Sequence, residues 1–456
     1  MQKKRQMTSE MWVVAVLIAM LGGCLADIGA TRLELHINAP CRSSETVGGA
    51  PQGAVDDFPE NFTKPSDIAY RRLPGDNATK TWITAVSSRT QHRVLMGKTV
   101  EGGGIVKWLS AGPTDEEIAG GDSGKFAGFK DGTRSQARFN NPIGIAIDAA
   151  NEWVFIADSG NHRIRLWDRG NNSVSTLAGG PDPGSSDGEG SEASFNTPIS
   201  LALDPAAATT TLYVADAGND CIRKVEVIRD GENIRALVSR YAGACRGEGT
   251  TQAVSDLGIS GDLRLDGDSC AECFANGVLL DARFSFPTNV VVIPEKGKIG
   301  VSTEKPEGVQ LLVVDAGNHV LRLVTTTRVE TLLGRPGYVN ASNRPDKVQI
   351  FEGGAYNDSL HLNSPAGLAF SDDGWFAFSE PYDDRVSRVC QDQVVRVAPK
   401  KVDATVADEM TSFSRPAGLA IDTRGSNSGN LDILFVANEG STNADLLVRA
   451  IRVKDH

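Results

Sequence analysis

The sequence predicts an all-β fold built from six copies of one repeat, because three residue types recur at fixed spacing. Prolines mark the six copies at Pro65, Pro142, Pro198, Pro287, Pro365 and Pro416. Three residues before them stand the bulky apolar residues Phe62, Phe139, Phe195, Phe284, Leu362 and Phe413. Three residues after them stand the aliphatic residues Ile68, Ile145, Leu201, Val290, Leu368 and Leu419. Self-similarity of this kind indicates a repeat architecture.

Each copy reads as four short strands separated by turns. In the second copy the strand-like runs are 142–148, 153–158, 161–167 and 174–179. The inner runs are apolar at consecutive positions, which is typical of a strand that is covered on both faces. Four-stranded antiparallel units covered on both sides and arranged radially form a β-propeller.

Three copies carry a closely related turn motif. Residues 157–164 read Ala-Asp-Ser-Gly-Asn-His-Arg-Ile, 215–222 read Ala-Asp-Ala-Gly-Asn-Asp-Cys-Ile, and 314–321 read Val-Asp-Ala-Gly-Asn-His-Val-Leu. This motif resembles the NHL repeat over residues 60 to 453, although the first and fifth copies are degenerate and the sixth replaces the turn. The resemblance implies six blades, at about 62–112, 139–180, 195–243, 284–334, 362–400 and 413–453.

We expect the residues of this turn to be structural. Asp before a small-Gly-Asn turn accepts backbone N–H bonds, and Gly supplies a positive φ. The predicted turn residues are Asp158, Asn161, His162, Asp216, Asn219, Asp315, Asn318 and His319. The arginines at 163, 165, 223, 322, 385 and 388 recur with the blades and are interpreted as strand-edge and turn residues.

The last copy lacks a fourth strand before the chain ends. The N-terminal segment 27–61 contains a strand-like run at 32–38, which we expect to complete the last blade and remove its open edge. The insertions fall in the links between blades, at about 113–138, 181–194, 244–283, 335–361 and 401–412. In such a blade these links share one face with the turn between the second and third strands, so this face is the predicted binding surface for a protein or other extracellular ligand.

Residues 1–26 resemble a secretory signal peptide, with a basic start, an apolar run and small residues before Ala26. Cleavage there predicts a secreted protein, or one of the secretory pathway, with no transmembrane span in the mature chain. Two alternatives are a retained anchor and, in a bacterium, lipidation of Cys24.

Six cysteines follow residue 26, and an even number behind an export signal favours disulfides. We expect Cys221 and Cys245 to pair, because the strand ends that carry them lie side by side. The pairing of Cys41, Cys270 and Cys273 stays open, and Cys390 has no evident local partner. Sequons for N-glycosylation occur at Asn61, Asn77, Asn171, Asn340 and Asn357.

The chain of 456 residues carries a net charge of −12, and loss of residues 1–26 leaves −14. This acidity argues against nucleic acid as a partner, since phosphate binding needs clustered Lys and Arg. We expect a monomer.

The favoured function is a non-catalytic binding scaffold, because no catalytic constellation and no cofactor motif stands out. The alternative is a propeller hydrolase or lyase with Ca²⁺ or Zn²⁺ on the central axis, resembling lactonases, strictosidine-synthase-like enzymes or the peptide-amidating lyase. Its candidate metal ligands are Asp148, Asp204 and Asp422, at the ends of inner strands, because calcium prefers oxygen ligands. The same residues also fit ordinary turns.

Overall fold

The computed structural model describes residues 53–54, 63–72, 81–102, 105–109, 117–119, 127–231, 233–245, 274–295, 308–336, 347–349, 351–352, 355–356, 360–371, 374–390, 393–397, 413–422, 432–440 and 448–453. The predicted processing segment 1–26 and the predicted strand 32–38 lie outside these residues.

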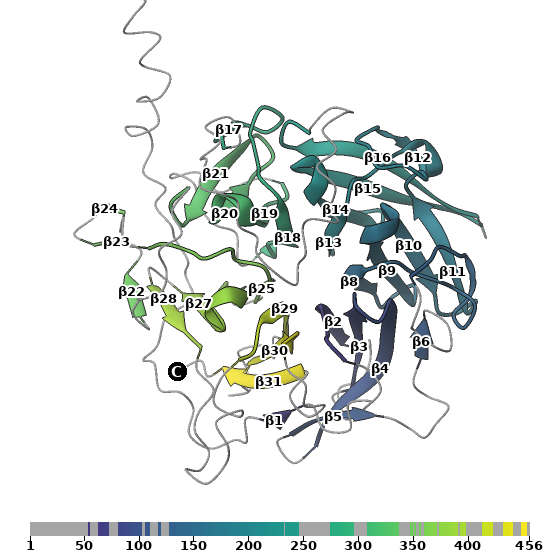
Figure 1. Ribbon diagram of the computed structural model, residues 1–456, viewed down its shortest axis with the longest axis horizontal. Helices are drawn as coiled ribbons and strands as arrows, with labels where there is room; N and C mark the ends of the chain where they lie inside the picture. Colours follow the sequence, from purple (N-terminus) through teal and green to yellow (C-terminus); the bar gives the residue numbers. More distant parts are fainter. Residues whose placement is uncertain are drawn as a thin grey trace, which may run out of the picture.

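The described strands form five antiparallel sheets of five strands and one of four, arranged around a common centre (Figure 1). The first contains β2 (Asp67–Arg72), β3 (Thr81–Ser88), β4 (Arg93–Gly102), β5 (Ile105–Leu109) and β6 (Glu117–Ala119). The second contains β7 (Gly132–Thr133), β8 (Pro142–Asp148), β9 (Trp153–Asp158), β10 (Arg163–Asp168) and β11 (Ser173–Ala178). The third contains β12 (Gly188–Glu189), β13 (Pro198–Leu203), β14 (Thr211–Asp216), β15 (Cys221–Asp230) and β16 (Asn233–Ala242).

The remaining sheets continue the ring. The fourth contains β17 (Gly277–Val278), β18 (Pro287–Val292), β19 (Leu311–Asp315), β20 (Val320–Val324) and β21 (Arg328–Leu333). The fifth contains β22 (Lys347–Gln349), β25 (Leu368–Phe370), β26 (Phe376–Glu380), β27 (Arg385–Cys390) and β28 (Gln393–Arg396). The four-stranded sheet contains β1 (Gly53–Ala54), β29 (Pro416–Asp422), β30 (Asp432–Asn438) and β31 (Val448–Val453). A separate hairpin pairs β23 (Phe351–Glu352) with β24 (Ala355–Tyr356).

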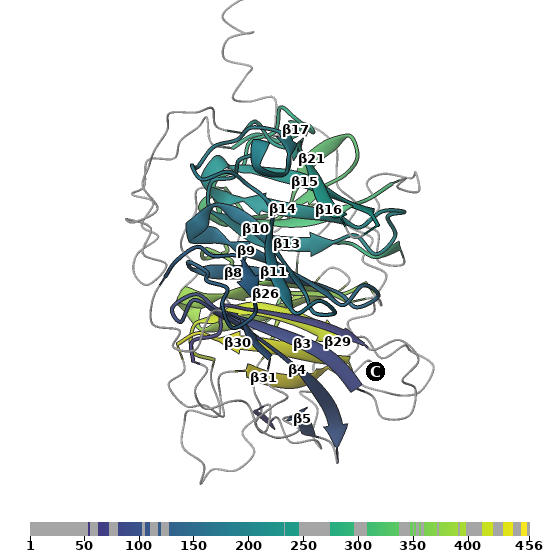
Figure 2. The ribbon, with the colours of Figure 1, turned by 90° about the vertical axis from the view of Figure 1, so that its right-hand side faces the viewer.

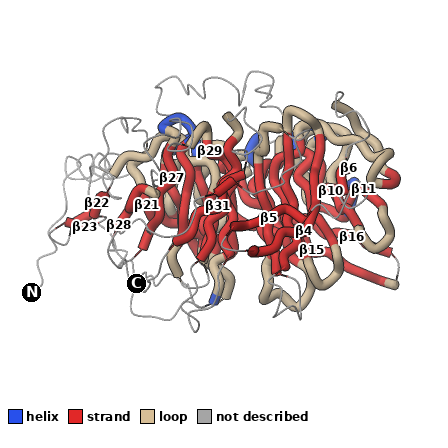
Figure 3. The backbone as a smooth tube through the Cα atoms, turned by 90° about the horizontal axis from the view of Figure 1, so that it is seen from below, coloured by secondary structure: helices blue, strands red, loops and turns tan. Residues whose placement is uncertain are grey.

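The innermost strands meet around the axis. Each contacts the next in the cycle β2, β8, β13, β18, β25, β29 and back to β2. Figure 2 shows the sheets stacked beside one another, and Figure 3 shows the strands crossing between two faces of the molecule. The all-β propeller predicted from the sequence is therefore confirmed.

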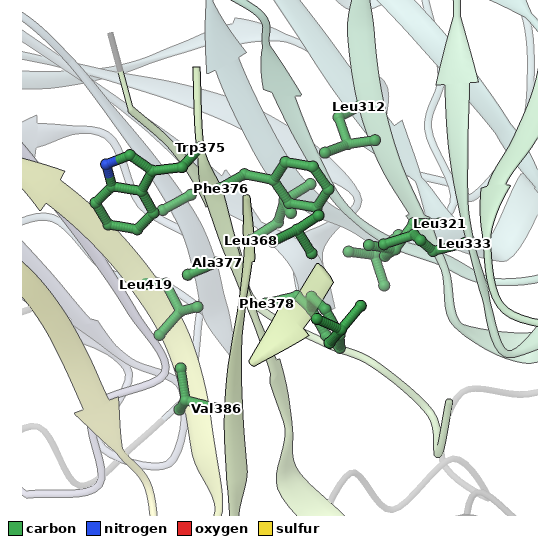
Figure 4. Packing of buried hydrophobic residues seen from close by; sticks show 14 of the residues in the cluster. Leu312, Leu321, Leu333, Leu368, Trp375, Phe376, Ala377, Phe378, Val386 and Leu419 are labelled. Atoms are coloured by element: carbon green, nitrogen blue, oxygen red, sulfur yellow. The ribbon is translucent and has the colours of Figure 1, made fainter. Parts of the chain in front are cut away.

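The second strand of each repeat explains why the apolar runs do not alternate. All six residues of β9 and all six of β14 are buried, as are all five of β19 and of β26. Each of these strands packs between two neighbouring sheets, so both of its faces need apolar side chains. Figure 4 shows one such contact, where Phe376 and Phe378 pack among leucines of adjacent sheets.

The prediction of four strands per blade is incomplete. Parts of four interblade links form an outermost fifth strand, as β7, β12, β17 and β22, each paired with the fourth strand of the following blade. The links are therefore partly sheet edges rather than free insertions. The sequence did not reveal these strands because three of them are only two residues long.

An N-terminal segment does complete the last sheet. Gly53 pairs with Ala450 and Ala54 with Arg449, so β1 covers the edge of β31. This segment differs from the predicted 32–38, and its two residues carry no strand pattern that the sequence could have shown.

The helices in the described part of the chain are 3₁₀ turns of three residues. They span Ser159–Asn161, Gly190–Glu192, Ala217–Asn219, Ala316–Asn318 and Pro381–Asp383. Four of them connect the second to the third strand of a sheet. We call the end of the propeller that carries these four turns the link face, and the opposite end, with turns such as 149–152 and 169–172, the hairpin face.

Candidate functional site

The second, third and fourth sheets each contain one buried ion pair that fixes the Asp-small-Gly-Asn turn of the repeat. Arg165 lies 2.7 Å from Asp158, Arg223 lies 3.2 Å from Asp216, and Arg322 lies 2.8 Å from Asp315. All six side chains are fully buried. The interpretation of these three arginines as strand-edge and turn residues is therefore wrong.

The turn asparagines complete the same arrangement. The amide of Asn161 donates to Asp158 at 2.8 Å, that of Asn219 to Asp216 at 2.7 Å and that of Asn318 to Asp315 at 2.9 Å. The other oxygen of each aspartate accepts a backbone N–H near the start of the blade, from Asn140, Asn196 and Ser285 respectively. Burial raises the pKa of Asp216 and of Asp315 to about 6, while the arginine and asparagine donors act in the opposite direction.

Each arginine also reaches outward to the interblade link. Arg165 donates to the carbonyl of Lys130 at 2.9 Å and contacts the Asp131 carboxylate, next to strand β7. Arg223 donates to the Ser186 carbonyl at 2.9 Å, and Arg322 to the Ala275 carbonyl at 2.8 Å. The guanidinium of Arg165 lies 5.2 Å from the ring of Phe139, the phenylalanine of the repeat. The arginines therefore hold the fifth strand onto the blade, by charge-assisted bonds and cation–π contact.

A sequence signal for these pairs exists. The arginine follows the aspartate by seven residues in all three copies. In an antiparallel pair joined by this turn, such a spacing places both side chains on the same face of the sheet.

The turn ends on a residue in the left-handed conformation, which bonds to the next blade. We call His92, His162, Asp220, His319 and Asp384 the turn-end residues; their φ values lie between 45° and 57°. Each accepts a hydrogen bond from the backbone N–H of the residue just before the next blade's proline. The five donors are Asn141, Thr197, Phe286, Ser364 and Arg415, at 2.7 to 3.0 Å. In the three histidines the acceptor is Nδ1, and burial lowers the pKa of each ring.

Polar groups of the repeat are thus occupied in holding the propeller, whereas the central axis carries two cavities. The first opens on the link face, encloses about 100 Å³ and is lined mainly by apolar side chains, among them Ile143, Ile199 and Phe286. The second, of about 200 Å³, follows the inner strands toward the hairpin face. We call the first cavity the mouth and the second the channel.

Asp67 and Asn289 line both cavities, so they mark the waist between mouth and channel. They occupy the same repeat position, two residues after the proline, in blades that stand opposite one another in the cycle of six inner strands. The other four copies have Gly144, Ser200, Gly367 and Gly418 at this position. A Cβ at Gly367 would lie only 1.9 Å from the carbonyl oxygen of Ala417, so the next inner strand leaves no room for a side chain there.

The Asp67 carboxylate accepts the backbone N–H of Ile145 at 3.1 Å. Burial raises the pKa of Asp67 to about 7, although bonds from the N–H groups of Ile145 and Ile68 lower it in part. No described residue forms an ion pair with it. Sequence reasoning missed Asp67, because no other copy of the repeat has an acidic residue at this position. Three copies have glycine there, one has serine and one has asparagine.

Two charged groups at the rim of the mouth are paired with each other. Arg89 of the first sheet and Glu439 of the four-stranded sheet form a salt bridge across the junction of these two sheets, and each side chain is 11% exposed. Beside this pair, Gly418 donates its N–H to the Ser66 carbonyl at 3.1 Å. Tyr382, which is 42% exposed, stands on the rim from the fifth sheet.

Two of the three proposed metal ligands, Asp148 and Asp204, have described side chains. Asp148 accepts bonds from the backbone N–H groups of Ala150 and Asn151, and Asp204 accepts that of Ala206, as in ordinary turns. The side chain of Asp422 lies outside the described residues. Among the side chains that are described, no group of three His, Cys, Asp or Glu residues is arranged to hold a metal ion.

Cys221 and Cys245 form a disulfide with Cα atoms 5.0 Å apart, the pair favoured by the sequence. Cys390 is also disulfide-bonded. Its partner lies outside the described residues, as do Cys24, Cys41, Cys270 and Cys273.

Of the five sequons only Asn171 is described. It is exposed, in the turn between β10 and β11 on the hairpin face. Asn61, Asn77, Asn340 and Asn357 lie outside the described residues. Within the described residues no helix has the length and apolar character needed to cross a membrane.

Comparison with known proteins identifies the repeat. A family model described as the NHL repeat matches residues 139–165. Protein SUPPRESSOR OF QUENCHING 1, chloroplastic, of Arabidopsis thaliana is 29% identical over 281 residues, which are 56% of this chain and 25% of the plant protein. NHL repeat-containing protein 2 of Bos taurus is 40% identical over 87 residues, 19% of this chain and 11% of the bovine protein. The chain thus matches a quarter or less of the length of these relatives.

Among solved structures, virginiamycin B lyase of Staphylococcus aureus is similar with a TM-score of 0.36 and 9% identity, over 89% of this chain and 88% of that one. The resemblance to the NHL repeat is confirmed by the family model over residues 139–165.

Replacement of Arg165 by Met should lower the free energy of unfolding by about 3–5 kcal/mol, because it leaves the buried Asp158 carboxylate without its cation. Urea unfolding followed by tryptophan fluorescence measures this loss. The matched control is Arg163→Met, two residues earlier on the same strand and only partly buried. Equal losses in the two variants would contradict a special role for the buried pair.

The three turn-end histidines should make stability depend on pH. Their pKa values are lowered in the folded protein, so on acidification below about pH 6.5 the unfolded chain takes up protons that the folded chain does not. Stability is therefore present above that pH and is lost as the pH falls. We expect the variant H92N/H162N/H319N, which keeps an acceptor and tolerates positive φ, to lose less stability than the parent between pH 7.5 and 5. Urea titrations at both pH values test this, because carboxyl groups common to both proteins cancel in the comparison, and parallel losses would refute it.

Proposed function

We propose that this chain is a six-bladed propeller that acts as a non-catalytic binding module and engages a partner on its link face. The four-stranded sheet would serve as the sixth blade. This is supported by the contacts of β29 with both β25 and β2, and by the pairing of β1 with β31. A propeller with no open edge is suited to presenting a rigid surface.

The observation that carries the proposal is the mouth. It is concave, largely apolar and lined by residues from all six sheets, which is the usual character of a binding pocket. The turns and links around it differ from blade to blade, whereas the inner polar groups are held by the fold. A protein or other extracellular ligand that covers the mouth would touch several links at once.

We further propose that the chain works as a monomer outside the cell or in the secretory pathway. The signal-like segment 1–26, the disulfide Cys221–Cys245 and the bonded Cys390 support an oxidising compartment. Glycans at Asn171 would stand on the hairpin face and leave the link face free. The net charge of −12 supports a partner other than nucleic acid.

An enzymatic function is the second candidate, because Asp67 stands in the axial cavity with its pKa raised to about 7. A carboxyl group that changes its charge near neutral pH suits general acid–base catalysis. In the metal-dependent form of this alternative, Ca²⁺ or Zn²⁺ would bind Asp148, Asp204 and Asp422.

Binding of the partner should be lost when a charge is introduced at the rim of the mouth. We expect Tyr382→Asp to abolish cross-linking of the tagged full chain to its partner in an extract of the source tissue. Asn172→Asp is the control, because it adds the same charge at an exposed position on the hairpin face. Loss of the same cross-links in the Asn172 variant, with retention in the Tyr382 variant, would place the partner on the hairpin face and refute the proposal.

Elemental mass spectrometry of the dialysed protein separates the two functions. A binding module should carry less than one equivalent of calcium or zinc. One equivalent that disappears in the triple variant D148N/D204N/D422N would favour the metal-dependent enzyme.

A further inference from the structure

The waist of the axial cavity holds a carboxylate for which the described residues supply no counter-ion. Asp67 accepts bonds from backbone N–H groups, and no described cation pairs with it. Arg71 lies four residues farther along β2, roughly 13 Å away at strand spacing, and does not contribute to the environment of the carboxyl group. Arg89, at the rim, is neutralised by Glu439.

The same position in other blades shows what Asp67 does for the fold. Ser200 accepts the N–H of Val290 at 3.3 Å, just as Asp67 accepts the N–H of Ile145. A hydroxyl therefore suffices for this interblade bond, and glycine suffices in three other blades. The negative charge of Asp67 is not needed to join the blades.

Asn289, on the other side of the axis, has a polar side chain that the fold also leaves unused. It lines both cavities, and no described residue hydrogen bonds to its amide. Above the waist the walls are mainly apolar, formed by residues such as Ile143, Ile199 and Phe286, while the charged residues that line the mouth besides Asp67 are Arg89, Arg415 and Glu439. The cavity thus presents an anion and an amide oxygen at the bottom of an apolar funnel.

We propose that the mouth binds a small primary amine with an apolar body, whose ammonium group rests between Asp67 and Asn289. An ammonium group has three N–H donors and needs acceptors on more than one side, which a carboxylate and an amide oxygen supply. The apolar body fills the mouth and releases water from its walls. A divalent cation fits less well, because Ca²⁺ takes six to eight oxygen ligands.

This site lies below the surface that contacts the proposed partner, and it does not depend on that function. Loss of amine binding would leave the cross-linking result at Tyr382 unchanged. Conversely, absence of a link-face partner would leave the amine site as a property of the axial cavity.

The test is to titrate the full chain with benzylamine, benzyl alcohol and benzoate in turn. Isothermal titration calorimetry and ligand-observed NMR measure the binding of each. Benzylamine should bind at least tenfold more tightly than the alcohol, and benzoate should not bind. Binding should strengthen from pH 6 to pH 8, because the carboxyl group at the waist must lose its proton to pair with the ammonium group.

Asp67→Asn should weaken benzylamine binding at least tenfold. It keeps an oxygen for the Ile145 N–H, so circular dichroism should show an unchanged fold. Asn289→Leu is a second variant on the other side of the axis and should weaken binding severalfold. Asp230→Asn, at an exposed end of β15, is the charge-matched control and should bind as the parent does.

Equal affinity for benzylamine and benzyl alcohol would overturn the proposal, as would unchanged benzylamine binding in Asp67→Asn. Absence of benzylamine binding to the parent protein at millimolar concentration would overturn it as well. If Asp67→Asn does not fold, the pH profile of the parent and the Asn289→Leu variant still decide between these outcomes.

Discussion

A hydrogen bond from a backbone N–H to a side chain, repeated at five junctions between neighbouring sheets, sets the geometry on which the rest of the propeller depends. Its donor is the N–H of the residue before the repeat proline, and its acceptor is the turn-end residue of the preceding blade. Donor and acceptor residues both have positive φ, although none of them is glycine. A left-handed conformation costs roughly 1–2 kcal/mol for such residues. The hydrogen bond at each junction offsets part of that cost, and it also fixes how one sheet is rotated relative to the next. Histidine and aspartate are interchangeable here because each offers one acceptor at a similar reach.

The buried ion pairs act within one blade, whereas the junction bonds act between two blades. Aspartate ties the turn to the start of its own blade, and arginine ties the incoming link to the third strand of the same blade, β10 in the case of Arg165. A buried charge is costly unless it is paired and hydrogen-bonded, and here the guanidinium of each pair is bonded on both of its terminal nitrogens. The result is that three interblade links are held near the outermost strand of the blade that they enter.

Closure of the ring brings the first sheet beside the four-stranded sheet at the mouth. The Arg89–Glu439 salt bridge, the bond from Gly418 to Ser66 and the contact of the Tyr70 and Phe435 rings at 5.1 Å all join the first sheet to the four-stranded one. The waist lies directly below this junction, because Asp67 follows Ser66 at the start of β2. A change in closure would consequently move one side of the axial cavity. Stability of the ring and shape of the candidate site thus depend on the same few residues.

The sequence by itself determined the repeat, the all-β propeller and the Cys221–Cys245 pair, because proline spacing, unbroken apolar runs and strand ends are local patterns that one blade displays alone. It also placed Asp158, Asn161 and His162 in a turn, since Asp, Gly and Asn shape turns wherever they occur. Burial of Arg165 and the bond from His162 to the next blade depend on residues 27 to 35 positions away, which no local pattern contains. The fifth strands are too short to carry a period, and β1 pairs across nearly the whole chain. Asp67 and Asn289 line the same two cavities only because the inner strands β2 and β18 face one axis, so the tertiary structure alone decided where a ligand could bind.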